Sequence, residues 1–409
     1  MKPHGPIPPG FAADADGMLL IGGQRADELA DIAGDTPLFV YDGAMLTARV
    51  AAWRAAMPAE VQLHYAMKAN PYAPLLAHMA ALVDGLDVAS GGELAMALGS
   101  GMAAAHISFA GPGKRDREIE AAIEAGATLN LESAGEAGRA LAIGERLGIA
   151  PRLAVRVNPD FDLKGSGMKM GGGAKPFGVD AAEVPALVRR LLAMGADWQG
   201  FHIFAGSQAL DADAISDTQA QTVALAARLA NEIGATPPLV NLGGGMGVPY
   251  FPGDMAVDVA AVGAALGETL AARDPVLGSS SFAMELGRWL VAEAGVYLTR
   301  VVDRKTSHGE TFLVTDGGLH HQLAASGNFG TVIRRNYPIA IASRFGAEPA
   351  ETVSVVGCLC TPLDRLGDQV ALPRGDVGDL VAIFQAGAYG ATASPSAFLG
   401  QGPAGEMLV

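Results

Sequence analysis

Short apolar segments alternate with Ala- and Leu-rich stretches over residues 60–290 of the 409-residue chain. Each apolar segment ends in Gly, Ser, Asn or a charged residue, and the stretch after it has the spacing of an amphipathic helix. The roughly eight segments are VQLHYAM, GLDVA, HISFA, ATLNL, RLAVRV, WQGFHIFA, LVNLG and SFAMEL. Eight strands that alternate with helices can close into a parallel barrel. The pattern therefore predicts an α/β fold with a (β/α)8 TIM barrel.

The pattern changes after residue 290. The segments AGVYLTRVVDRK, ETFLVTDGG, ETVSVVG, DQVALP and DLVAIFQAG are rich in Val and Thr, and turn residues separate them. This alternation predicts a C-terminal antiparallel β domain. The early segment TPLFVYD, residues 36–42, also has the character of a strand. We expect residues 1–43 to pair with the β domain, residues 44–288 to form the barrel and residues 289–409 to form the β domain.

Composition and charge narrow the class of protein. The length favours two domains, and a hydrophobic content of 50% is typical of a globular chain. The net charge of -15 disfavours binding to nucleic acid or to an anionic membrane, so an anionic ligand would need a local positive site. No apolar run predicts a membrane span or a secretory signal. Two cysteines in a C-x-C pair disfavour a disulfide framework and a zinc site, which favours a reducing, cytoplasmic compartment.

Polar residues follow the early predicted strands, at the barrel end where function collects in this fold. Lys68 follows the first strand, and a desolvated lysine there could form a Schiff base, although a solvated surface lysine is an equal alternative. The second strand ends at Asp87, with Glu93 in the next helix. Glu132 follows the fourth strand and Arg156 closes the fifth. Each of these could equally be a structural residue of the barrel mouth.

The last two predicted strands carry features of a phosphate site. Gly243, Gly244 and Gly245 follow the seventh strand, and Gly287 and Arg288 follow the eighth. Successive glycines expose backbone N–H groups without hindrance from Cβ, and the arginine adds formal charge. The loops after strands seven and eight are the expected phosphate site of this fold.

Two further residues suit an electron-accepting ring. A carboxylate such as Glu285 beside a pyridinium nitrogen would keep that nitrogen protonated, so that the ring could accept an electron pair. His202, which belongs to the sixth strand, could stack on the face of such a ring. A hydrogen-bonded core histidine is an equal alternative for His202.

With these residues in place, the chain resembles the fold-type III decarboxylases that depend on pyridoxal 5'-phosphate (PLP). This is the diaminopimelate/ornithine decarboxylase family, which has an alanine-racemase-like barrel. The resemblance runs from Thr36 to Gly390 and rests on HYAMKANP, LDVASGGEL, RVNPD, HIFAGS, GGG, ELGR and GAYG, in that order. It implies a PLP cofactor, the α-decarboxylation of an amino acid by a carboxy-lyase of amino-acid metabolism, and a homodimer with active sites at the interface.

The resemblance also implies residue roles. Lys68 would hold PLP as a Schiff base, and Glu285 would pair with the pyridine nitrogen. Cys360 would reach in from the partner subunit and help to return a proton to Cα. The residues that support Lys68 and the ring would be Asp87, Glu93 and Arg156. The residues that bind the phosphate would be Ser207, Gly243, Gly244, Gly245, Gly287, Arg288 and Tyr389.

The stacking residue departs from the family pattern, which is a compact His-x-Gly-Ser. Here Phe204 falls on the position of the stacking histidine, and His202 lies two residues earlier. Either ring could cover the cofactor, so both stay candidates.

The substrate-binding segments also depart from the pattern. Thr361 follows Cys360 where the family has an acidic residue that helps to hold the distal ammonium of the substrate. The segment GNFGTVIRRNYPI offers Arg334 and Arg335 where ornithine-type enzymes carry acidic residues. Arginines favour a carboxylate or a phosphate, so a diamine precursor becomes a weaker candidate substrate.

These variants are similar to a subgroup associated with exosortase-linked exopolysaccharide and natural-product clusters. That subgroup includes a decarboxylase of glutamate tethered to an acyl carrier protein. We therefore expect an acidic or carrier-tethered amino acid as substrate. One alternative is a diaminopimelate- or ornithine-type decarboxylase of a free diamino acid. Another is a PLP racemase, disfavoured because racemases place Arg at the pyridine nitrogen. A third is a non-catalytic PLP carrier, disfavoured because such proteins are typically the barrel alone.

Overall fold

The computed structural model describes residues 1–165, 167–169, 171–327 and 335–409. The chain forms two compact units. A β unit comprises residues 1–48, 248–255 and 288–409, and a barrel unit comprises residues 49–247 and 256–287. Residues 248–255 thus group with the β unit, although they lie inside the range 44–288 that we predicted for the barrel.

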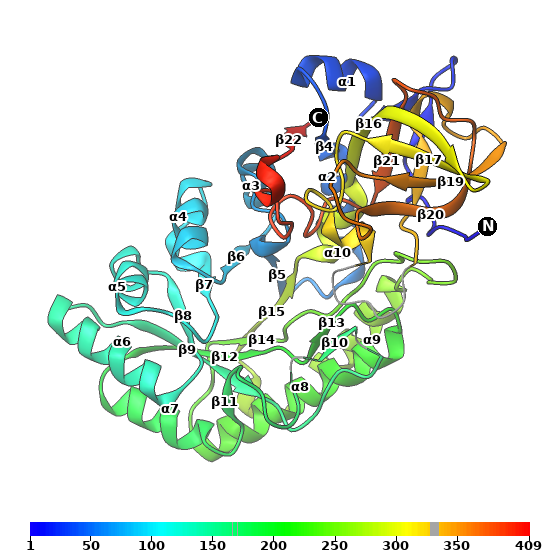
Figure 1. The fold of residues 1–409 in the computed structure, drawn as a ribbon. Coiled ribbons are helices and arrows are strands. Elements are labelled where there is room, and N and C mark those ends of the chain that lie inside the picture. Colours follow the sequence, from blue (N-terminus) through cyan, green and yellow to red (C-terminus); the bar gives the residue numbers. More distant parts are fainter. Residues whose placement is uncertain (166, 170, 328–334) are drawn as a thin grey trace. The chain divides into compact units, whose positions relative to one another are not determined.

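The barrel unit contains a closed ring of parallel strands (Figure 1). In ring order the strands are β5 (Val61–Ala66), β6 (Gly85–Val88), β7 (Ile107–Phe109), β8 (Thr128–Leu131), β9 (Arg152–Asn158), β12 (Asp197–Ile203), β14 (Leu239–Asn241) and β15 (Ser281–Leu286). β8 pairs with β9 and β15 pairs with β5, so the ring has no open edge among these strands. The short strand β11 (Val179–Asp180) adds to the outside of β9. The predicted eight-stranded barrel is confirmed.

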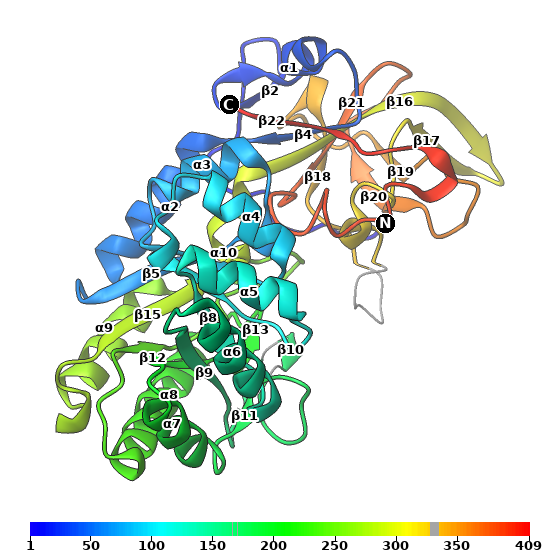
Figure 2. The ribbon, with the colours of Figure 1, turned by 90° about the vertical axis from the view of Figure 1, so that its left-hand side faces the viewer.

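Helices between the strands cover the outside of this barrel (Figure 2). They are α3 (Ala73–Ala80), α4 (Gly91–Gly99), α5 (Asp116–Ala125), α6 (Ala134–Leu147), α7 (Val184–Ala193), α8 (Ala212–Ile233) and α9 (Val259–Ala271). The helix α7 buries Val184, Leu187, Val188 and Leu191, which is the spacing of one helix face. The side chain of Ser90 accepts a hydrogen bond from the Glu93 N–H at 3.1 Å and so caps the start of α4.

The β unit is built on a mostly antiparallel sheet. Its strands are β4 (Leu38–Tyr41), β16 (Gly295–Ser307), β17 (Glu310–Thr315), β18 (Ile339–Ile341), β19 (Glu351–Val356), β20 (Arg365–Leu372), β21 (Leu380–Phe384) and β22 (Gly405–Leu408). The order is β18-β21-β16-β17-β19-β20, and β4 pairs with β16 and β22. The pairs β17–β19 and β22–β4 are parallel and the others are antiparallel. The predicted antiparallel domain is confirmed with these two exceptions.

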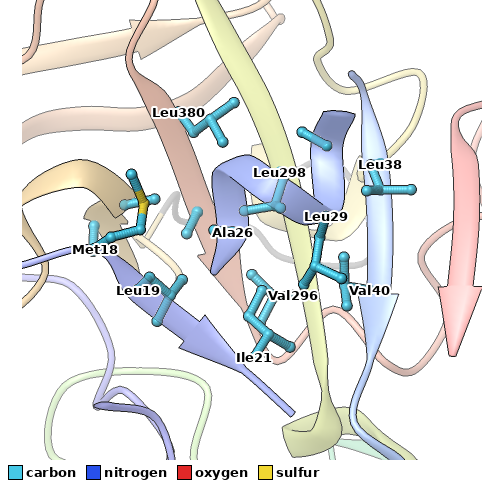
Figure 3. Packing of buried hydrophobic residues seen from close by; sticks show 14 of the residues in the cluster. Met18, Leu19, Ile21, Ala26, Leu29, Leu38, Val40, Val296, Leu298 and Leu380 are labelled. Atoms are coloured by element: carbon cyan, nitrogen blue, oxygen red, sulfur yellow. The ribbon is translucent and has the colours of Figure 1, made fainter. Parts of the chain in front are cut away.

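A buried apolar cluster joins the N-terminal segment to this sheet (Figure 3). Leu38 and Val40 of β4 pack with Val296 and Leu298 of β16, and Leu29 of helix α1 (Ala26–Ala33) packs on the same cluster. β4 runs antiparallel to β16, with Leu38 opposite Leu298. The segment TPLFVYD is therefore a strand of the β unit.

The remaining helix of several turns is α2 (Gly43–Ala56). The other strands and helices are short: β1 (Ala12–Ala13), β2 (Leu19–Ile21), β3 (Gln24–Arg25), β10 (Met168–Lys169), β13 (Gly206–Ser207) and α10 (Arg288–Val291). Within the described residues, no helix is both long and apolar enough to span a membrane. The same residues include no group of three or more His, Cys, Asp or Glu side chains that could hold a metal ion.

Candidate active site

The first and last strands of the barrel bring Lys68 and Glu285 together. Lys68 lies in the turn Met67–Ala69, directly after β5. Glu285 lies on the neighbouring strand β15, in register with His64 of β5. The Lys68 Nζ is 4.0 Å from Glu285 Oε1, and 46% of the lysine side chain is exposed against 7% for the glutamate. The mouth of the barrel therefore presents an accessible amine beside a buried carboxylate.

Glu285 is held as a carboxylate by its neighbours. Burial opposes its ionisation, but a hydrogen bond and the charge of His202, together with the charges of Lys68 and Arg156, lower the pKa of Glu285 below its usual value. The His202 Nε2 lies 2.8 Å from Glu285 Oε2, and His202 is 2% exposed. The ring of His202 is thus engaged with the carboxylate from inside the barrel.

Phe204 lies two residues beyond His202, just after β12 ends. Its ring centroid is 5.9 Å from the Lys68 Nζ, and the residue is half-buried. Of the two candidates for a stacking residue, Phe204 is the one whose aromatic face flanks the lysine amine.

Arg156 and Glu132 form an ion pair at the mouth, with Arg156 Nη1 donating to Glu132 Oε1 at 2.8 Å. Glu132 also accepts from the backbone N–H groups of Gly111 and Gly178, at 2.6 and 2.7 Å. These contacts lower the pKa of Glu132 against the opposing effect of burial. Glu132 therefore orients Arg156 and ties two mouth loops together.

Asp87 and Glu93 lie at the end of β6 and the start of α4. Glu93 accepts a hydrogen bond from the Ala89 N–H at 2.6 Å, and burial raises the pKa of Glu93 although the nearby Lys68 charge acts the other way. Asp87 is 6% exposed. Both of its carboxylate oxygens are buried and accept no hydrogen bond from any described residue. The His64 Nδ1, 3.5 Å from Asp87 Oδ2, is the charged neighbour that the structure shows for this carboxylate.

The three glycines after β14 are required by close backbone approach. A Cβ atom at Gly244 would lie 1.9 Å from the backbone oxygen of Glu285, and one at Gly243 would lie 2.5 Å from the backbone oxygen of Ile203. Gly243 and Gly245 also adopt positive φ values of 69° and 114°. The Gly243 N–H donates to Asn241 Oδ1 at 2.9 Å. Only glycine fits this loop, which lies against the ends of β12 and β15.

The neighbouring candidates Ser207 and Gly287 also lie in the barrel unit. Ser207 is part of β13, which pairs with β10. A Cβ at Gly287 would lie 3.0 Å from the Cβ of Ala69, next to Lys68 in the chain. Gly287 thus borders the turn that carries the lysine.

Arg288 continues the chain from Gly287 into the β unit, where it contacts two tyrosines. Its Nη1 donates to the Tyr250 hydroxyl at 2.8 Å, and its guanidinium lies 4.7 Å from the ring centroid of Tyr389. The Nε of Arg288 is buried and has no hydrogen-bond partner among the described residues. A buried guanidinium N–H without a partner fits an anion such as a phosphate. Sequence reasoning missed Tyr250, because no local motif links it to Arg288.

The loop of residues 357–364 carries Cys360 and Thr361 in the β unit. Cys360 is an exposed free thiol. The Asp364 carboxylate accepts from the N–H groups of Leu319 and Leu359, at 2.7 and 2.8 Å. The Thr361 hydroxyl accepts from the Leu363 N–H at 3.3 Å. The Asp364 and Thr361 side chains therefore hold the conformation of this loop through hydrogen bonds to its backbone and to Leu319.

The two arginines predicted to bind substrate differ in what the structure shows. The Arg335 guanidinium is 3.7 Å from the ring centroid of Phe251, also in the β unit. Arg334 lies outside the described residues. Among the barrel candidates, the structure brings together Lys68, Glu285, His202 and Phe204 and pairs Arg156 with Glu132. It places Arg288, Arg335, Cys360, Thr361 and Tyr389 in the β unit.

Comparisons with known proteins identify the family of this chain. Residues 44–292 match the family described as "Pyridoxal-dependent decarboxylase, pyridoxal binding domain". L-glutamyl-[BtrI acyl-carrier protein] decarboxylase of Niallia circulans is 36% identical over 91% of this chain and 89% of its own length. Diaminopimelate decarboxylase of Archaeoglobus fulgidus is 31% identical over 97% of this chain and 92% of its own length.

A solved structure extends the agreement to the whole fold. The crystal structure of diaminopimelate decarboxylase from M. jannaschii in complex with L-lysine matches with a TM-score of 0.88 and 27% identity. The match covers 98% of this chain and 92% of the other. The predicted resemblance, the predicted cofactor and the predicted enzyme class are thus confirmed.

The residues of this chain also fit that cofactor. In the barrel unit, an accessible amine lies beside an ionised, buried carboxylate, and the loop after β14 has a backbone that only glycine fits. In the β unit, Arg288 has a buried N–H without a partner among the described residues. These groups suit an aldehyde, a pyridinium nitrogen and a phosphate, respectively. The chain belongs to the fold-type III family of pyridoxal-phosphate-dependent decarboxylases, which are carboxy-lyases.

Proposed function

We propose that this enzyme removes the α-carboxylate of an acidic amino acid, carried as a thioester on an acyl carrier protein or free in solution. The observation that supports this most directly is the loop of residues 357–364. Thr361 carries no charge, and both oxygens of Asp364 accept backbone hydrogen bonds. Asp364 is also only 3% exposed, so this loop offers no exposed carboxylate to pair with a distal ammonium group. Desolvating such a group without a partner costs several kcal/mol, on the order of the cost of any unpaired buried charge.

Two further observations favour an acidic or tethered substrate. Arg335 is exposed and could pair with a carboxylate or a phosphate. The relative from Niallia circulans, 36% identical over most of this chain, is named for a glutamyl group on a carrier protein. Thioester arms on carrier proteins are attached through a phosphate. An arginine can therefore pair either with the side-chain carboxylate of an acidic substrate or with the phosphate of its carrier arm.

Within this proposal the barrel residues hold and tune the cofactor. Lys68 would hold the cofactor covalently through Nζ, and Glu285 would keep the pyridine nitrogen protonated. His202 fixes Glu285 by their 2.8 Å contact, and Phe204, whose ring lies beside the Lys68 amine, would contact the face of the cofactor ring. Bound PLP supplies the electron sink that accepts the electron pair left when CO2 departs. The residues that we propose to hold the phosphate are Ser207, Gly243, Gly244, Gly245, Gly287, Arg288 and Tyr389.

The remaining assignments concern support and assembly. Asp87, Glu93 and Arg156 orient Lys68 and the ring from the barrel. We propose a homodimer in which the thiol of Cys360 from the partner subunit delivers a proton to Cα after CO2 has left. Cys360 is an exposed free cysteine, which supports this role. We also propose a cytoplasmic location, because the chain has only two cysteines. We keep residues 1–43, 44–288 and 289–409 as the proposed functional division of the chain.

A substrate panel tests the proposed function. We expect glutamate or a glutamyl carrier protein to give a higher kcat/KM than ornithine, lysine or meso-diaminopimelate, because a distal ammonium finds no exposed carboxylate in the loop of residues 357–364. Release of CO2 measured with purified protein and each compound checks this. A clear preference for a diamino acid would instead assign the enzyme to diaminopimelate- or ornithine-type decarboxylation.

A mixing experiment tests the shared site. Lys68→Ala and Cys360→Ala chains are each expected to be inactive alone, and mixing them should restore activity. Each heterodimer would contain one site with both residues intact. Cys358→Ala, which removes the half-buried neighbouring thiol, serves as the control in place of Cys360→Ala. Subunit exchange seen by native mass spectrometry without recovered activity would show that each chain completes its own site.

A further inference from the structure

The amino-terminal end of the barrel contains a small pocket of mixed polar and apolar lining, opposite the strand ends that carry Lys68 and Glu285. The pocket has a volume of about 80 Å³, enough for a few water molecules. Asp84, His106 and Arg152 lie at its rim, and His64 and Asn130 line its inner wall beside the apolar Phe201. Barrels of this type are usually filled by bulky branched side chains, so the polar residues among this lining give water a place inside the barrel.

His64 connects this pocket to the candidate active site. It is 5% exposed and lies on β5 in register with Glu285 of β15 and Gly85 of β6. The His64 Nδ1 is 3.5 Å from Asp87 Oδ2. A Cβ atom at Gly85 would lie 2.9 Å from the His64 Nε2, so glycine at that position makes space for the ring. Asp87 in turn is in register with Ala66, two residues before Lys68.

The charges around His64 favour its protonated form. Burial lowers the pKa of His64, but the negative charges of Asp87, Glu285 and Asp84 raise it overall. The other titratable groups of the pocket are His106 and Arg152. Asp87 needs a countercharge, because both of its buried oxygens accept no hydrogen bond from the described residues.

We propose that His64 is a positioning residue of the active site. In its protonated form, His64 pairs with the Asp87 carboxylate inside the barrel. Water in the adjoining pocket allows the His64–Asp87 pair to exchange its proton with solvent. The inference rests on the proposed role of Asp87 in supporting Lys68. A space-filling role for the ring is the competing explanation, and it predicts no dependence on charge.

Histidine NMR titration of the full chain tests the charge coupling without any turnover. The resonance that is absent from His64→Gln identifies His64. Its pKa is expected to lie above that of an ordinary histidine and to fall by about one unit or more in Asp87→Asn, because the neighbouring negative charge is gone. The exposed His106 is the internal control and should shift little. An unchanged His64 pKa in Asp87→Asn would overturn the proposal.

Imidazole rescue then tests the role in catalysis. His64→Ala is expected to lose about tenfold or more in kcat with KM nearly unchanged, and imidazole should restore kcat saturably by entering through the pocket. Rescue should weaken as the pH rises, because the protonated ring is the form that pairs with Asp87. His106→Ala is the matched control.

His64→Ala could instead lose thermal stability, keep the wild-type pH profile and show no recovery of kcat with imidazole. That result would show that His64 only fills space. If His64→Ala does not fold, His64→Gln replaces it in the comparison of pH profiles. Should wild-type protein decarboxylate no tested amino acid, the proposed function fails, while the NMR titration still decides the inference about His64.

Discussion

Lys68→Ala is expected to lower the rate of decarboxylation by about four orders of magnitude or more, because the chain then lacks the amine that binds the cofactor covalently. Lys68 lies in the turn after β5, 4.0 Å from Glu285 and 5.9 Å from the ring of Phe204. With 46% of its side chain exposed, its amine is open to an incoming aldehyde. Wild-type protein should be yellow, and the absorbance of the lysine-bound cofactor should be absent from Lys68→Ala.

Peptide mapping locates the attachment independently of activity. Borohydride reduction of wild-type protein should fix the cofactor on Lys68. Lys164 is an exposed lysine of the same unit, so Lys164→Ala is the matched control and should keep both the yellow colour and the rate. Cofactor found on Lys164 or Lys175 instead would exclude Lys68 as the attachment point.

Local sequence pattern was sufficient to predict the barrel. Each strand is a short apolar run that ends at a glycine or a polar residue, and this pattern repeats through the closed ring from β5 to β15. A predicted barrel also has a known active end, so Lys68, Glu285 and the glycines after β14 were candidates from their positions at strand ends. Their expected roles came from the resemblance to the family, because position alone left a solvated Lys68 equally possible.

Contacts between distant segments were not predictable from local pattern. His202 and Phe204 were equivalent candidates for the stacking residue, and local pattern could not predict the 2.8 Å contact of His202 with Glu285 on another strand. No local sequence pattern predicts the contact of Tyr250 with Arg288 either. Both residues belong to the β unit, because residues 248–255 group with that unit. The parallel pairing of β17 with β19 is likewise a property of tertiary structure, because alternation of side chains is the same in parallel and antiparallel strands.

Glu285→Gln should retain the cofactor and lose about 10²–10³-fold in kcat, or about 3–4 kcal/mol of barrier, as for other preorganised charges. Glutamine keeps the size of the side chain and a contact with His202, but it cannot hold a positive charge at the pyridine nitrogen. Because its neighbours lower the pKa of Glu285, the carboxylate stays ionised as the pH falls through the usual range of a glutamate, and activity that depends on it should persist there.

Glu285→Asp is the matched variant, since it restores the charge at a shorter reach and should recover part of the rate that Glu285→Gln loses. Cofactor absorbance shows whether each variant is loaded, and single-turnover release of CO2 reports the chemical step. The groups that we propose to bind the phosphate are backbone N–H groups of the loop after β14 and the side chain of Arg288. Neither substitution replaces them, so loading should change little in either variant. Near wild-type turnover in loaded Glu285→Gln would show that another group holds the proton of the pyridine nitrogen.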